Sequence, residues 1–118
     1  MANENLVVLQ GNLTRDCELK QIGSDGCVVN CAIAINRHYT KADGEQVKEA
    51  TFVDLEAWGA IAEALAKRGR TGDILYVRGR LKQDTWEKDG EKRSKLKVSI
   101  ERFSVFPKPQ KIEDNFDE

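Results

Sequence analysis

The chain has 118 residues, of which 40% are hydrophobic and 33% charged, and it contains three cysteines and one histidine. A chain of this length and composition builds one domain around a single core, which excludes two domains and disorder throughout. Three cysteines and one histidine are too few for a typical metal site or disulfide framework, so we expect no metal and no cofactor.

The formal net charge of −1 is unevenly distributed along the chain. Four of the last six residues are acids and none is a base, so the rest of the chain carries a charge of +3, with 19 bases against 16 acids. We therefore predict a mildly basic domain over residues 1–108, followed by a short acidic tail over residues 109–118. The first twenty residues are charged and lack a sustained apolar run, so we expect neither a signal peptide nor a membrane span, and a cytoplasmic location.

The first predicted strand, residues 5–11, is apolar on both faces. In strand geometry Leu6 and Val8 point to one side, while Val7 and Leu9 point to the other. One face packs on the core, and the second needs a cover, which a partner subunit or a folded-over loop can supply. We favour the partner subunit and expect a homo-oligomer.

The stretch 27–36 is the second predicted strand, and one of its faces is apolar throughout. Cys27 and Cys31 share that face roughly 13 Å apart at the usual rise per residue, too far to bridge each other or to share an ion. We therefore predict buried thiols on a core face formed by Cys27, Val29, Cys31, Ile33 and Ile35.

The third predicted strand, residues 51–58, has two different faces. Val53, Leu55 and Ala57 form an apolar face that belongs to the core. The other face carries two large aromatic residues and two carboxylates, which indicates a working surface, although the aromatic residues can also pack under a loop. This face consists of Phe52, Asp54, Glu56 and Trp58. We expect its two carboxylates to be solvated rather than catalytic.

A short amphipathic helix is predicted directly after this strand. Gly59 breaks the alternation, and Ile61, Ala62 and Leu65 then recur at helical spacing. Two basic residues and two glycines end the helix, namely Lys67, Arg68, Gly69 and Gly72.

Two further strands are predicted over residues 73–82 and from residue 96 to about residue 106. Inward-facing positions on the first are Leu75, Val77, Gly79 and Leu81, and on the second Leu96, Val98 and Ile100. Five strands with one short helix between the third and fourth match an all-β OB-fold barrel.

Two polar stretches separate these strands. Residues 38–50 are predicted to form a loop with a tight turn at Asp43-Gly44, for which a protruding hairpin is the alternative. Residues 83–95 are predicted to form a charged hairpin loop around Asp89-Gly90, with Trp86 as the only large apolar side chain.

Four aromatic residues lie on the non-core face of the third strand or in the polar stretches, and basic residues accompany them. Unpaired bases stack on aromatic rings and phosphates attract cations, so this combination indicates a site for single-stranded nucleic acid. Each ring could instead be a lid over the barrel. The candidate site consists of Tyr39, Phe52, Trp58, Trp86, Arg37, Lys41, Arg80 and Lys82.

The sequence offers little for catalysis. It has no phosphate-binding glycine loop and no zinc-binding histidine pair, and His38 is the only imidazole. We therefore reject an enzyme.

Four motifs in order resemble the bacterial single-stranded DNA-binding proteins over about residues 5–106. They are VLQGNLTRD at 8–16, NRHY at 36–39, TFVD at 51–54 with Trp58-Gly59, and YVRGRL at 76–81 leading to Trp86. The resemblance implies an OB fold, a homotetramer, and stacking aromatic residues at the positions of Tyr39, Phe52, Trp58 and Trp86.

The chain departs from that family in two places. Asp84 and Thr85 stand where family members often have basic residues, which predicts weaker phosphate contacts. The long linker is nearly absent and no terminal Pro-Phe is present, so partner recruitment by the tail is in doubt. The tail residues that could still recruit replication and repair proteins are Glu113, Asp114, Phe116, Asp117 and Glu118.

The sequence thus predicts a non-catalytic, largely sequence-independent binder of single-stranded DNA that acts in replication, recombination and repair. Such a protein is expected in the cytoplasm with the nucleoid. The alternative is an OB-fold interaction module of a nucleoprotein assembly in which DNA binding is weak or lost.

Overall fold

The computed structural model describes residues 2–24 and 26–108, which form six strands and one helix. The strands are β1 (Val7–Leu13), β2 (Lys20–Ile22), β3 (Gly26–Thr40), β4 (Gln46–Trp58), β5 (Ile74–Lys88) and β6 (Glu91–Phe106), and the helix is α1 (Gly59–Arg68). Within the described part of the chain, no helix is long and apolar enough to cross a membrane.

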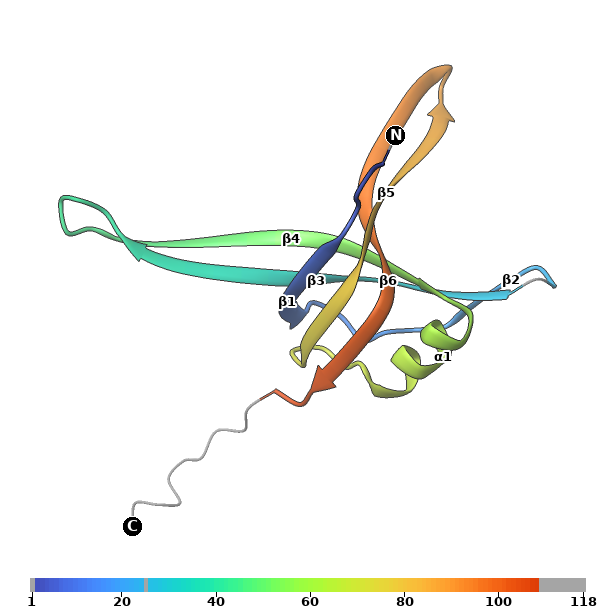
Figure 1. The fold of residues 1–118 in the computed structure, drawn as a ribbon, viewed down its shortest axis with the longest axis horizontal. Coiled ribbons are helices and arrows are strands. Elements are labelled where there is room, and N and C mark those ends of the chain that lie inside the picture. The colour runs from blue at the N-terminus through green and yellow to red at the C-terminus, as the bar shows by residue number, and fades with distance from the viewer. Residues whose placement is uncertain (1, 25, 109–118) are drawn as a thin grey trace, which may run out of the picture.

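Five of the strands close into a barrel (Figure 1). The order runs β1-β5-β6-β4-β3, and β3 pairs back with β1. Neighbours are antiparallel except β4 and β6, which are parallel. The predicted all-β OB-fold barrel, with its helix between the third and fourth predicted strands, is confirmed. The short β2, which pairs with β3, was not predicted, because three exposed residues carry no alternation signal.

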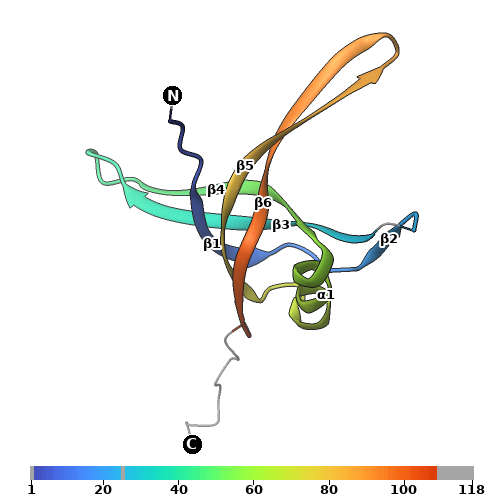
Figure 2. The same cartoon turned by 45° about the vertical axis from the view of Figure 1, so that its right-hand side comes forward.

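The core forms where the predicted inward faces meet. Cys27, Val29, Cys31 and Ile33 of β3 are buried as predicted, and the thiols are free. Helix α1 adds Ala62 and Leu65, which are also buried, and lies at one end of the barrel (Figure 2). The alternation of apolar residues therefore located the core correctly in these elements.

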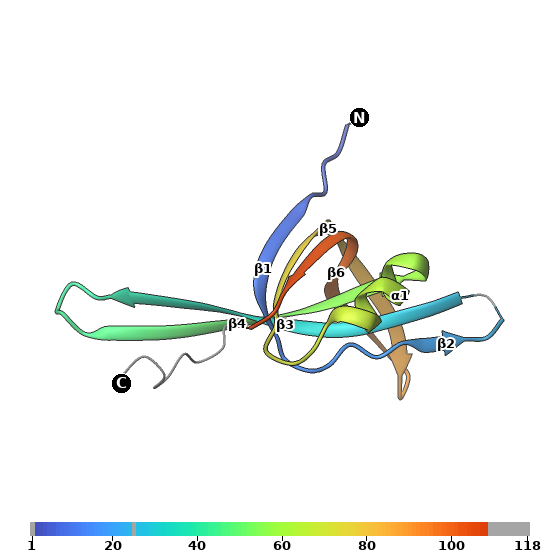
Figure 3. The same cartoon turned by 90° about the horizontal axis from the view of Figure 1, so that it is seen from below.

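Two long hairpins project from the barrel in different directions (Figures 1 and 3). The β3–β4 arm turns over residues 41–45, and the β5–β6 arm turns at Asp89 and Gly90. Both turn residues of the second arm have positive φ, 55° and 80°, as a two-residue type I′ hairpin requires. The predicted loops 38–50 and 83–95 are therefore mostly strand, and the hairpin alternative is correct for the first.

The β5–β6 arm bends away from the barrel at a register shift between Arg78 and Gly79. A Cβ at Gly79 would lie 1.9 Å from the backbone oxygen of Ser99, so only glycine allows the two strands to approach this closely. Leu81 and Leu96 follow on the arm and are exposed, which corrects their prediction as core residues. The arm leaves the barrel beyond Val98, which is still buried, so Leu81 and Leu96 lie outside the core.

The outward side of β1 is exposed. Val7 and Leu9 pack against the core, whereas Leu6 and Val8 are more than half exposed. No loop among the described residues covers them, so the folded-over loop considered from the sequence is wrong for this part of the chain.

Candidate nucleic-acid interface

The non-core side of β4 carries the exposed aromatic residues that the sequence indicated. Phe52 is 69% exposed and Trp58 is 45% exposed, so neither is packed under a loop. Their partners across the β3–β4 pair are Ala34 and Val28, which share the same side of the sheet. Because these partners are small or buried, they leave both rings open to a ligand.

The β5–β6 arm continues this surface. Side chains directly opposite each other in an antiparallel pair lie on the same side, and β5 residues 82, 84 and 86 stand opposite β6 residues 97, 95 and 93. Trp86, 45% exposed, therefore lies on the same side as Arg93.

Ion pairs join the arm to β4. Lys95 Nζ lies 2.6 Å from Asp54 Oδ2, and Lys97 Nζ lies 3.0 Å from Glu56 Oε1. Together the two elements form one surface, called here the outer face. It consists of Phe52, Asp54, Glu56, Trp58, Arg80, Lys82, Asp84, Trp86, Arg93, Lys95 and Lys97.

Glu56 is buried on the outer face, with 3% exposure, which corrects the prediction of a solvated carboxylate. It accepts hydrogen bonds from Trp58 Nε1, Lys82 Nζ and Lys97 Nζ. Burial alone would raise the pKa of Glu56, but these hydrogen bonds outweigh it and hold the pKa below its ordinary value. The lysines of the arm cover the carboxylate. This contact joins strands that are distant in the sequence, so residue spacing could not predict it.

Lys97 is shared between two acids. Its Nζ also lies 2.5 Å from Asp84 Oδ2, and this hydrogen bond lowers the pKa of Asp84. Burial opposes the charge of Lys97, yet its bonds to Asp84 and Glu56 prevail and raise the pKa. All of these groups are therefore charged at neutral pH, and the arm's lysines are partly neutralised before any ligand arrives.

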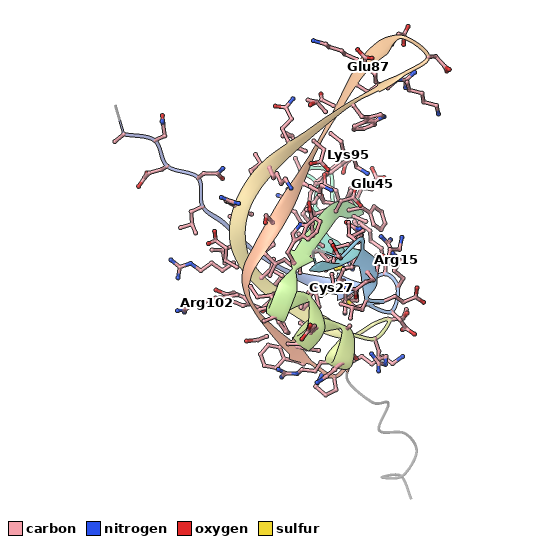
Figure 4. The ribbon with its side chains drawn as sticks, turned by 90° about the vertical axis from the view of Figure 1, so that its right-hand side faces the viewer. Arg15, Cys27, Glu45, Glu87, Lys95 and Arg102 are labelled. Carbon is pink, nitrogen blue, oxygen red and sulfur yellow. The ribbon has the colours of Figure 1, made fainter. Side chains whose placement is uncertain are left out.

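A hollow lies beside these ion pairs. It has a volume of about 210 Å³, and its charged and polar lining comes from Arg15, Asn30, Asp54, Lys95 and Lys97. Figure 4 shows Lys95 and Arg15 on one side of the barrel and Arg102 on the other, with Glu87 near the tip of the arm. Three cations around one hollow can hold a phosphate group.

The β3–β4 arm carries the remaining candidates. Tyr39 receives the Arg37 guanidinium over its ring at 4.8 Å, and Arg37 pairs with Glu49 at 3.5 Å. Lys41 lies in the turn, where it pairs with Glu45. The register places Tyr39 and Arg37 on the side of this arm opposite to Phe52, so the structure does not bring all four aromatic residues onto one face.

Sequence reasoning missed several basic residues of the candidate interface. Lys95 and Lys97 alternate with Leu96 and Val98, and this alternation could have placed them beside Trp86. Lys48 accompanies Tyr39 in the sequence, but the register places it opposite His38 on the same side as Phe52. The tail candidates Glu113, Asp114, Phe116, Asp117 and Glu118 lie outside the described residues.

The outer face can stack planar rings and bind anions. Three exposed aromatic side chains lie among cations on a barrel surface, and within residues 2–24 and 26–108 no cluster of three or more acids, histidines or cysteines could hold a metal ion. This combination of fold and surface defines an OB-fold protein of the oligonucleotide-binding type.

Comparison with known proteins identifies the family. Residues 4–106 match the model of the single-strand binding protein family, so the chain belongs to this family and the resemblance drawn from the sequence motifs is confirmed. The single-stranded DNA-binding protein of Aquifex aeolicus is 37% identical over 92% of this chain and 74% of its own. That of Treponema pallidum is 39% identical over 84% of this chain, but the match spans only 56% of the Treponema protein.

Solved structures share the fold. The Plasmodium falciparum SSB in complex with ssDNA superimposes with a TM-score of 0.77 at 15% identity, over 91% of this chain and 96% of its own. A deletion mutant of the single-stranded DNA binding protein from Thermus aquaticus gives a TM-score of 0.76 at 26% identity, over 87% of this chain and 50% of its own.

Proposed function

We propose that the chain binds single-stranded DNA, largely without sequence preference and without catalysis. The observation that carries this proposal is the outer face, where the exposed rings of Phe52, Trp58 and Trp86 lie among lysines and arginines. Aromatic rings stack on unpaired bases of any sequence, and cations follow the phosphate backbone. The names of the Aquifex and Treponema relatives, and the DNA in the Plasmodium complex, support the same ligand.

The biological setting follows from this ligand. A protein that covers single strands protects them during replication, recombination and repair, in the cytoplasm with the nucleoid. The acidic tail remains a candidate contact for proteins of those processes. The exposed apolar side of β1, with Leu6 and Val8, supports a homo-oligomer, for which a tetramer is our expectation.

A second function is favoured by the acids on the outer face. Lys82, Lys95 and Lys97 are each paired with a carboxylate, which leaves less charge for phosphates. An OB-fold interaction module of a nucleoprotein assembly, with weak DNA binding, would carry such a surface.

Tryptophan fluorescence separates these two functions. The chain has two tryptophans, Trp58 and Trp86, and both lie on the outer face. Adding oligo-dT should quench their emission strongly and saturably, and raising the salt concentration should weaken binding. A duplex of the same length should quench much less, because its bases are already stacked on each other. Absence of saturable quenching at low salt would favour the interaction module.

Light scattering tests the oligomer. Val8→Lys places a charge in the exposed apolar side of β1 and should dissociate the assembly. Ile22→Lys, at an exposed apolar residue of β2, is the matched control and should leave the mass unchanged. A wild-type chain that stays monomeric at micromolar concentration would contradict the proposed assembly.

A further inference from the structure

Glu56 is the only charged residue that is buried among those described, and it lies between two strongly exposed aromatic positions on β4. A buried carboxylate is costly unless hydrogen bonds and opposite charges compensate for its lost hydration. The structure supplies that compensation from three side chains, so the site is arranged around the carboxylate.

Lys82 Nζ donates to both carboxylate oxygens, at 3.4 Å to Oε1 and 3.3 Å to Oε2. Oε1 also lies 3.0 Å from Lys97 Nζ, and Oε2 accepts the hydrogen bond from Trp58 Nε1. Lys82 and Lys97 stand opposite each other on β5 and β6, and both also pair with Asp84. The arm therefore fixes the carboxylate, and the carboxylate in turn fixes the indole N–H.

An exposed tryptophan on a strand normally samples several rotamers, and a ligand that stacks on it must first select one of them. Trp58 is almost half exposed, yet its N–H edge is tied to a buried group two residues earlier on the same side of the strand. The ring is thus held in one orientation before a ligand binds. The conformational entropy of the Trp58 side chain is therefore lost during folding and not during binding.

We propose that Glu56 is a positioning residue that holds the Trp58 indole ready to stack on a base and links it to the β5–β6 arm. This inference rests on the proposed function. Glu56 itself does not contact DNA in this scheme, and its effect on affinity passes through the indole N–H. Ordering one side chain on binding corresponds to about a two- to tenfold change in affinity.

A double-mutant cycle isolates that effect. Trp58→Phe keeps a stacking ring but has no N–H, and Glu56→Met keeps most of the side-chain volume but has no acceptor. Glu56→Met should weaken oligo-dT binding about two- to tenfold more in the Trp58 protein than in the Trp58→Phe background. The change in charge near Lys82 and Lys97 affects both backgrounds equally and cancels in the cycle. Additive effects would overturn the proposal.

Glu56→Gln guards against misfolding, because it preserves the shape of the side chain and an oxygen that can accept the indole N–H. It should retain a larger share of the coupling than Glu56→Met. Equal coupling losses in the two variants would show that an oxygen able to accept the indole N–H does not restore the coupling, and would refute the positioning role.

A readout without DNA completes the test. In a Trp86→Phe background Trp58 is the only tryptophan, and its indole N–H should exchange slowly with solvent in NMR. Glu56→Met should make that exchange fast. If the indole N–H already exchanges fast when Glu56 is present, the hydrogen bond between Trp58 and Glu56 is contradicted. If oligo-dT does not bind the wild-type chain, the proposed function fails, while the exchange measurement still decides the hydrogen bond.

Discussion

Asp84 offers a direct test of how the outer face meets a phosphate. Its Oδ2 lies 2.5 Å from Lys97 Nζ, and its Oδ1 lies 3.9 Å from Lys82 Nζ, so it occupies a position that a DNA phosphate could take. Asp84→Asn removes the negative charge with little change of shape, and it leaves each of the two lysines with Glu56 as its remaining carboxylate partner. We expect the variant to bind oligo-dT more tightly than the wild-type chain.

The size of the gain follows from the geometry. A phosphate oxygen at a usual hydrogen-bond distance from Lys97 would lie roughly 5 Å from the Asp84 carboxylate. Coulomb repulsion between unit charges at that distance in water changes a binding constant about fourfold. If a lysine that no longer pairs with Asp84 also releases one more counterion, the slope of log affinity against log salt should steepen by about 0.7 for a single strand.

Fluorescence titration at several salt concentrations measures both quantities. Glu101→Gln is the matched control, because Glu101 is an exposed acid that lines a different hollow, beside Ala60 and Ile61 of α1. The control reports the effect of overall charge. If Asp84→Asn and Glu101→Gln change affinity and salt slope equally, then Asp84 does not compete with phosphate, and the reasoning about the paired lysines is refuted.

Four further predictions concern other parts of the chain. Trp86→Ala should lower oligo-dT affinity by about 1 to 3 kcal/mol with an unchanged melting temperature, a magnitude taken from OB-fold relatives, whereas a lower melting temperature at unchanged affinity would show a lid. Gly79→Ala should lower the free energy of unfolding by about 1 to 3 kcal/mol in denaturant titrations, because the added Cβ would meet the Ser99 backbone. An unchanged free energy of unfolding would contradict the close approach of the two strands. Deletion after Lys111 should tighten DNA binding at low salt, since four acids no longer compete for cations, and equal affinities would exclude self-inhibition. The pKa of Glu56 is lower in the folded state than its ordinary value of 4.5, so the ionised carboxylate stabilises the fold at pH values above 4.5. This stability is lost as the pH falls through the lower folded-state pKa. Between pH 7 and pH 3 the melting temperature of Glu56→Gln should therefore fall less than that of the wild-type chain.

The elements with regular alternation could be read from the sequence. Cys27, Val29, Cys31 and Ile33 on β3, and Ala62 and Leu65 on α1, are buried where their spacing placed them. Strand and helix periodicity are local properties, so a single sequence contains them. The aromatic residues of β4 and the arm were found in the same way, because large apolar side chains on a polar face conflict with the local pattern.

Contacts between distant segments were decided only by the tertiary structure. Alternation gives Glu56 the same side of β4 as Phe52, yet Glu56 is buried because Lys82 and Lys97 reach it from an arm that begins after a register shift at Gly79. The same bend exposes Leu81, whose spacing matched the core. The side of a strand that a residue occupies is a local property, whereas its burial and charge partners depend on which other strands arrive there, and that is set by pairing across the whole barrel.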